Sequence, residues 1–193
     1  MPEGANTRQG AAWQMKQCAE KCLAICQEAE ILNEMSIALM REVMVLDGLF
    51  YGMDSKEVMI RQAILVRAVF KSGLHSMPKP PYVSPTSEYR RRIFMSVYDV
   101  DKALSWFAGM PPVMFQRHCM MQAPLDLSDE QLSRSLEEIA SAAARLDQRG
   151  WNTDGKIHEV TTWRARYELS KVKEEIQDIS AQIDSEGKKD RIE

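Results

Sequence analysis

The cysteines and histidines are the residues best suited to metal binding or nucleophilic chemistry in this chain, which has 4 Cys and 3 His among 193 residues. Cys18, Cys22 and Cys26 are spaced four apart, so one helical face would carry all three thiols, and a soft metal such as Cu(I) accepts such ligands. Small apolar residues are also wanted at this spacing in a helix seam, and unpaired cysteine packs like one. We favour core positions and predict no metal site.

The other motifs that carry chemistry are incomplete. The loop 150–161 has the Asp-Gly turn of a calcium-binding loop but lacks its first carboxylate and its final glutamate. His158-Glu159 begins like a zinc-protease motif, yet Thr162 stands where the second histidine belongs. Glycine-rich phosphate-binding patterns are missing as well. We therefore predict no catalytic residues and no cofactor, and we expect a protein that is not an enzyme.

A run of three arginines, Arg90-Arg91-Arg92, breaks a local preference. It falls in the first turns of a predicted helix, where the helix dipole is positive and disfavours cations. The middle of the chain is also basic: residues 61–119 have a net charge of +6, while 1–60 have −4 and 120–193 have −5. An anionic partner, either membrane headgroups or RNA, would compensate for this cost. The candidate anion-binding residues are Arg90, Arg91, Arg92, Lys71, Lys79 and Lys102.

Internal pairing is the alternative explanation for this basic segment. The arginines would then form ion pairs with the acidic N-terminal helix or with a neighbouring subunit. The sequence leaves both explanations open.

Composition and periodicity predict an all-α fold that positions these residues. The chain has 9 Gly, 8 Pro and 45% apolar residues, and its apolar residues recur three and four apart. We expect a multi-helix bundle of about six helices with long N- and C-terminal helices. The approximate ranges are 12–47, 54–72, 84–108, 113–121, 129–149 and 156–184.

The proline-rich segment 78–87 predicts a connection between two helical modules, 1–77 and 88–193. One compact domain is the alternative organisation.

The C-terminal helix has an apolar stripe that requires a partner. A helix of this length with such a face uncovered would expose a large apolar patch. Its partner is either the N-terminal helix or another copy of the chain, and we predict a homo-oligomer. The oligomerisation residues are Leu169, Val172, Ile176, Ile179 and Ile183.

The sequence also indicates where in the cell the protein is located. No apolar segment follows the polar N-terminus as in a secretory leader, and no uninterrupted apolar run approaches the length of a membrane span. We expect a cytoplasmic protein, or one peripheral to the inner face of a membrane, that is not secreted and has no transmembrane segment.

The segment 83–94, VSPTSEYRRRIF, followed by Asp101-Lys102-Ala103-Leu104, resembles part of the influenza-type orthomyxovirus matrix protein family. The shared pattern is a Ser-Glu helix start, an arginine triplet, a phenylalanine and an Asp-basic-Ala helix. The resemblance covers residues 83–104. It implies an all-helical structural protein that polymerises under a membrane in the virion interior, with Arg90, Arg91 and Arg92 on its basic face.

Two classes of function follow from these features. The first is a structural, self-assembling helical protein that meets an anionic surface. The second is a helical adaptor or regulator that binds another protein through a groove between its long helices.

Overall fold

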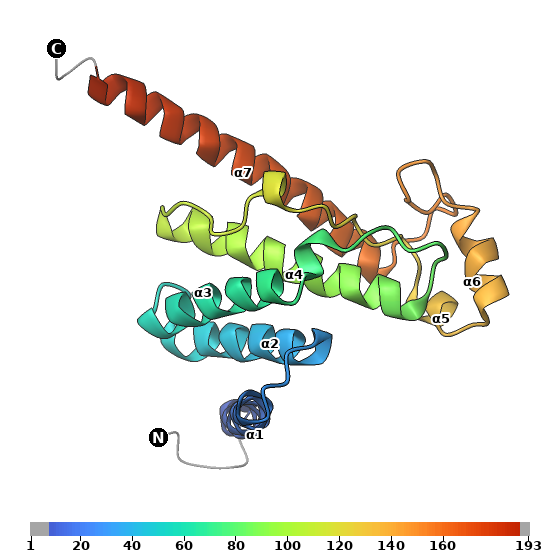
Figure 1. Cartoon of the computed structure of the whole chain (residues 1–193), viewed down its shortest axis with the longest axis horizontal. Coiled ribbons are helices and arrows are strands. Elements are labelled where there is room, and N and C mark those ends of the chain that lie inside the picture. Colours follow the sequence, from blue (N-terminus) through green and yellow to red (C-terminus); the bar gives the residue numbers. More distant parts are fainter. Residues whose placement is uncertain (1–7, 190–193) are drawn as a thin grey trace. The chain divides into compact units, whose positions relative to one another are not determined.

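The computed structural model describes residues 8–189, and the side chains of Gln9 and of 182–189 are not included in the description. Within this range the fold is all-α, as predicted, with helices throughout and no strand. Figure 1 shows the elements, which in chain order are α1 (Arg8–Glu28), α2 (Glu34–Tyr51), α3 (Lys56–Lys71), η1 (Leu74–Ser76), α4 (Pro85–Ala108), η2 (Gln116–His118), α5 (Asp129–Leu132), α6 (Leu136–Ala143) and α7 (Glu159–Lys189).

The chain divides into two compact units, with the boundary between Ser72 and Gly73. Unit 1 contains α1, α2 and α3, and unit 2 contains the remaining elements. The boundary therefore precedes the proline-rich segment 78–87, which lies inside unit 2.

The predicted helix over 12–47 is wrong as one continuous element, because the chain ends α1 and starts α2 within it. Glu30 has a left-handed φ of 53°. The Ile31 N–H donates to the Cys26 carbonyl at 2.8 Å, and the Glu30 N–H donates to the Gln27 carbonyl at 3.1 Å. These two bonds form a Schellman C-cap. Asn33 then caps α2 by accepting a hydrogen bond from the Ser36 N–H at 3.0 Å.

In unit 1, α2 packs against both α1 and α3. Its core contains Ile37, Val43 and Met44 from α2, packed with Val58 and Leu65 from α3. α3 begins after Ser55, whose hydroxyl accepts from the Val58 N–H, rather than at Asp54 as predicted. α3 also has an exposed face, which includes Ile60 and Ile64.

In unit 2, α4 packs along α7 (Figure 1). Its predicted start is confirmed: Ser84 and Ser87 form a reciprocal capping box, and Pro85 occupies the first turn. Gly109 ends the helix with a left-handed φ of 63°. Much of α4 is buried, so α4 is the central helix of unit 2.

The predicted helices over 113–121 and 129–149 are shorter in the structure. The first is reduced to η2. The second is divided into α5 and α6, because Ser135 forms a new capping box with Glu138 after α5 has ended at Ser133. α5 and α6 close over a small core of Leu127, Leu132, Ile139 and Ala142.

Candidate functional site

Arg91 and Arg92, two of the three arginines in the predicted anion-binding run, form ion pairs and hydrogen bonds with other residues of unit 2. Arg91 is only 6% exposed, and its Nη1 donates to Glu88 Oε1 at 2.8 Å. Arg92 donates to the Leu127 carbonyl at 2.8 Å and pairs with the Asp129 carboxylate. These contacts join the start of α4 to the segment that leads into α5. The partners of Arg91 and Arg92 therefore lie in unit 2, not in the acidic N-terminal helix.

The carboxylate beside Arg91 is deeply buried. Burial raises the pKa of Glu88 above its ordinary value, although Arg91 and a hydrogen bond from the Leu125 N–H at 2.7 Å act in the opposite direction. Arg91 thus favours the charged form of this buried carboxylate. Its primary role is structural.

Lys102 was expected on the basic face, but the structure buries it completely, with 0% exposed. Its Nζ lies 2.9 Å from Asp101 Oδ2 and 3.0 Å from Glu174 Oε2, and it also donates to the Met114 carbonyl. A fully buried, ion-paired ammonium presents no charge to a partner. Lys102 therefore does not belong to an exposed basic face.

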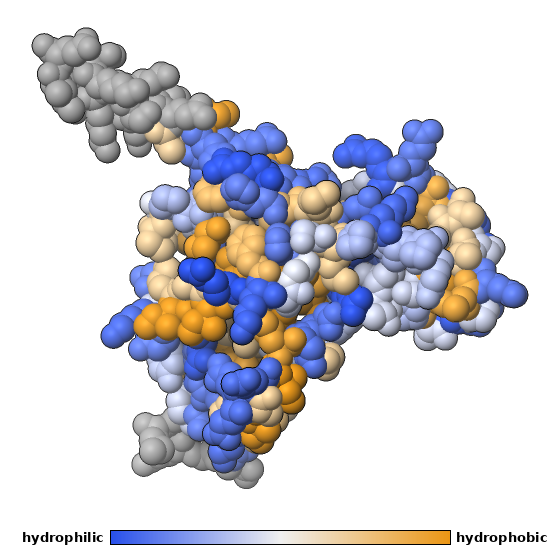
Figure 2. All heavy atoms as spheres, viewed as in Figure 1, coloured by the Kyte–Doolittle hydropathy of each residue, from blue (hydrophilic) through white to orange (hydrophobic). Residues whose placement is uncertain are grey.

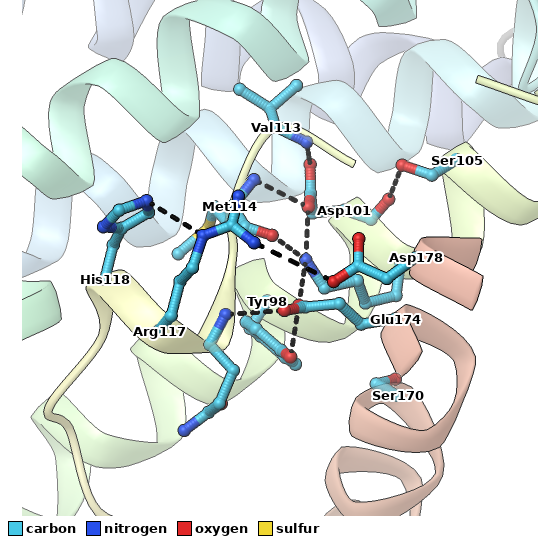
Figure 3. A network of polar contacts seen from close by, with 12 residues as sticks. Tyr98, Asp101, Ser105, Val113, Met114, Arg117, His118, Ser170, Glu174 and Asp178 are labelled. Carbon is cyan, nitrogen blue, oxygen red and sulfur yellow. Dashed lines mark hydrogen bonds and ion pairs between the residues drawn. The ribbon is translucent and has the colours of Figure 1, made fainter. Parts of the chain in front are cut away.

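Through these contacts Lys102 joins a polar network between α4, α7 and the segment 113–116. Figure 3 shows this network, with Asp101 and Glu174 labelled. Asp101 accepts the Val113 N–H at 3.1 Å and the Met114 N–H at 3.0 Å. Glu174 accepts the Tyr98 hydroxyl at 2.7 Å and the Gln116 N–H at 2.8 Å. These bonds fasten an irregular segment to two helices, so the network has a positioning role.

The protonation states of the network are fixed by its contacts. Burial alone would raise the pKa of Glu174, but hydrogen bonds from Tyr98, Gln116 and Lys102 outweigh it and lower the pKa. Burial, together with the bond to Glu174, raises the pKa of Tyr98 well above its ordinary value. At neutral pH the carboxylate is therefore charged and the phenol remains a donor.

Sequence reasoning missed Tyr98, Asp101 and Glu174 as a connected group. One signal was available: Asp101 and Lys102 interrupt an otherwise apolar helix pattern. Nothing in the spacing indicates that Glu174, more than 70 residues later, completes the group.

The remaining predicted cations lie elsewhere. Lys79, Arg90 and Arg91 line a small cavity of about 60 Å³ in unit 2, together with Ser87 and Gln122. Lys79 is exposed and Arg90 is half-buried. Lys71 is exposed at the end of α3 in unit 1. Of the six candidates, Lys71 and Lys79 are thus exposed, Arg90 is half-buried, and the other three are paired inside unit 2.

The predicted oligomerisation stripe faces outward on α7. Leu169 is 54% exposed, Val172 47%, Ile176 45% and Ile179 56%, and the Ile183 side chain lies outside the described residues. The face of α7 that packs inward consists of Val160, Arg164, Tyr167, Ser170 and Glu174. Glu174 is two positions from Val172 and from Ile176, a rotation of about 200° around the helix. The stripe and the packed face are therefore opposite sides of α7.

α7 also extends past its packed portion (Figure 1). Glu174 is its last buried residue in the part whose side chains are described. Figure 2 shows hydrophobic surface directly beside the grey end of this helix. Ile176 and Ile179 lie beyond Glu174 and are each about half exposed, so the uncovered stripe continues past Glu174.

The cysteines do not occupy the predicted core seam. Cys18 and Cys22 are exposed on α1 and Cys26 is half-buried, so only Cys119 is buried among the four. Burial raises the pKa of the Cys119 thiol to about 11, which keeps it protonated at neutral pH. Residues 8–189 contain no cluster of three or more His, Cys, Asp or Glu side chains able to hold a metal ion.

The comparisons with known proteins add no relative: no family model, no curated protein and no solved structure matches the chain. Among the described residues, no helix has both the length and the hydropathy needed to cross a membrane. The function is therefore inferred from the fold and from the surface of each unit.

Proposed function

We propose that this chain is a structural, self-assembling helical protein with a basic face for an anionic surface, similar to a viral matrix protein. The observation that carries the proposal is the aliphatic stripe of α7, which faces away from the body of unit 2. Its partner is a second copy of the chain.

The stripe is large enough to drive association. Four neighbouring aliphatic side chains on one helix are each about half exposed. Covering the exposed half of each contributes about 1 kcal/mol. A contiguous patch of this kind on a soluble protein marks an interaction surface rather than ordinary surface variation.

The anionic partner is membrane headgroups or RNA, and Lys79 and Arg90 of unit 2 are the residues proposed to meet it. Lys71 is an exposed cation of unit 1 and is not assigned to this face. The resemblance of residues 83–104 to orthomyxovirus matrix proteins supports this part of the proposal, as does the position of Lys79 and Arg90 beside the same cavity of unit 2. The proposed location is peripheral to the inner face of a membrane. Arg91, Arg92 and Lys102 serve the fold of unit 2 instead.

The dependence of molecular mass on protein concentration tests the proposed self-assembly. We expect the mass of the wild-type chain in light scattering to rise with concentration beyond that of two chains. A mass that stays at one chain at every concentration would contradict the proposal.

A groove favours a second candidate function, that of an adaptor or regulator that binds another protein. Unit 2 has a hollow of about 480 Å³ between the end of α4 and the part of α7 that follows Glu174. Met110, Pro112 and Phe115 line one side, and Ile176 and Ala181 line the other. An adaptor with this groove would remain a monomer or a dimer at all concentrations, so the same measurement separates the two functions.

A further inference from the structure

The stripe on α7 has the heptad spacing of a coiled-coil seam. Assigning Leu169 to position a places Ile176 and Ile183 at a, and Val172 and Ile179 at d. The preceding heptad has Thr162 at a and Ala165 at d, and both are exposed. The seam thus covers three heptads, from residue 162 to residue 183.

The packing of α7 in unit 2 leaves this seam accessible. Tyr167 and Glu174 occupy position f, and Ser170 occupies position b; all three are buried on the side that faces α4. Positions b and f lie on the outside of a coiled coil. Copies of α7 can therefore meet along a and d while each keeps its contact with α4.

The charges beside the seam select a parallel arrangement. Glu168 and Glu175 occupy position g, and Lys173 occupies position e. In a parallel coiled coil, g of one helix meets e of the following heptad in its neighbour, so Glu168 faces the Lys173 of the next copy. This contact is attractive.

The antiparallel arrangement brings like charges together. The antiparallel register with the greatest overlap stacks Ile176 on Val172 of the other helix. Lys173 then approaches the other Lys173, and Glu175 approaches the other Glu175. Like charges at such close range are destabilising.

Glu168 has a partner within its own helix, because its Oε2 lies 2.7 Å from Lys171 Nζ. The Glu168 side chain is 39% exposed and that of Lys171 is 30% exposed. An ion pair of this kind contributes little net stability, so Glu168 can exchange it for Lys173 of another chain at small cost.

The residue types at d determine how many chains the seam accommodates. Two-stranded coiled coils favour leucine at d, whereas β-branched residues at both a and d favour three or four strands. Here d carries Val172 and Ile179, and a carries Ile176. The seam is therefore not that of a dimer.

We infer that α7 mediates a parallel coiled coil of three or four copies of this chain, built on Leu169, Val172, Ile176 and Ile179. This inference rests on the proposed self-assembly and specifies its orientation and number of chains. The Glu168 carboxylate of each copy pairs with the Lys173 ammonium of the next.

Cysteine cross-linking of the full chain tests the orientation. The starting variant carries Cys18→Ser, Cys22→Ser and Cys26→Ser, which leaves only the buried Cys119. Leu169→Cys and Ile179→Cys are then introduced singly and treated with a short bis-maleimide. We expect each single variant to cross-link with itself, because a parallel coiled coil places identical residues at the same level.

An antiparallel coiled coil would give the opposite pattern. It places each Ile179 opposite Leu169 of the other chain and separates identical residues by about 15 Å along the axis. Only a mixture of the two variants would then cross-link, and this result would overturn the inference. Thr162→Cys, at an exposed position a, replaces either variant whose circular dichroism shows a loss of helix, because the antiparallel arrangement separates its two copies by about 36 Å along the axis.

Light scattering during dilution tests the number of chains. We expect the smallest species above the monomer to contain three or four chains. A dimer that grows into larger species at higher concentration would overturn the inference while leaving self-assembly intact. A wild-type chain that stays monomeric and never cross-links would overturn both proposals.

Discussion

Lys102 is completely buried, and its charge is compensated by Asp101 and Glu174 within unit 2. Replacing such a buried pair by apolar residues is often tolerated, but removing one partner leaves an uncompensated charge. The same distinction applies to Arg91 and Glu88 at the start of α4. Both cations were candidates for binding an external anion, and both have roles in the stability of unit 2.

Substitution of Lys102 by methionine should destabilise the protein strongly. Lys102→Met leaves Asp101 and Glu174 without a cation, so we expect the free energy of unfolding to fall by about 3–5 kcal/mol. Adding Glu174→Gln should recover part of this loss. Denaturant titration measures both, with Lys156→Met, at an exposed lysine, as the control that changes stability by less than about 0.5 kcal/mol.

The lowered pKa of Glu174 predicts that its contribution to the free energy of unfolding is lost in acid. Its pKa in the folded protein lies below the ordinary value of 4.5, so its contribution is fully present above about pH 4.5 and is lost as the pH falls through the folded pKa. Glu88, whose pKa is raised, acts in the opposite direction. We therefore expect the difference in stability between wild type and Glu174→Gln to shrink on acidification from pH 6 to about pH 3. A constant difference over that range would contradict this role.

At the scale of single elements, α1 and α7 share one property: several large apolar side chains face outward, while charged side chains are buried on the packed face. On α1, Met15 is 70% exposed and Ile25 is 63% exposed, while Lys16 is buried. Lys16 Nζ lies 2.9 Å from Asp47 Oδ1 of α2. Paired charges therefore dock both helices within their units.

The break between α1 and α2 gives a test at this scale. Glu30 adopts a left-handed conformation that costs a residue with a Cβ atom about 1–2 kcal/mol, and glycine avoids this cost. Glu30→Gly should raise the free energy of unfolding by about 0.5–1 kcal/mol. The matched change Glu28→Gly, at the end of α1, should lower it by about the same amount. Thermal melts of the two variants should shift in opposite directions.

The sequence predicts the elements better than their contacts. Local signals identify the α4 start at Ser84 and its end at Gly109, because capping is a short-range property. The break at residues 29–33 was missed because an unbroken 3–4 spacing of apolar residues runs across it. Periodicity locates the stripes on α1 and α7, but it does not reveal which face packs within the chain. That choice depends on distant partners such as Asp47 for Lys16 and Glu174 for Lys102.

At the scale of the whole molecule, the net charge is −3, so affinity for an anion must come from a local cluster of cations. Lys79 and Arg90 line the same small cavity in unit 2. Each cation near an anionic bilayer contributes about 1 kcal/mol. The double variant Lys79→Ala, Arg90→Ala should therefore bind anionic vesicles about thirtyfold more weakly in flotation.

The control for this prediction is Arg92→Ala. Its guanidinium is already paired with Asp129 and the Leu127 carbonyl. This variant should melt at a lower temperature and keep its vesicle binding. Wild-type protein that does not float with anionic vesicles at low salt would contradict the basic-face proposal.

Self-assembly through α7 is the central claim, and light scattering of a stripe variant tests it most directly. Ile176→Asp with Ile179→Asp removes about 2 kcal/mol of apolar burial per chain and places charges on the seam, so association should weaken at least thirtyfold. Ile157→Asp alters an isoleucine that is 83% exposed but lies before α7, and it should assemble like the wild type. We predict a folded monomer for the stripe variant and growing assemblies for the wild type and the control. The same mass for all three proteins would contradict the claim.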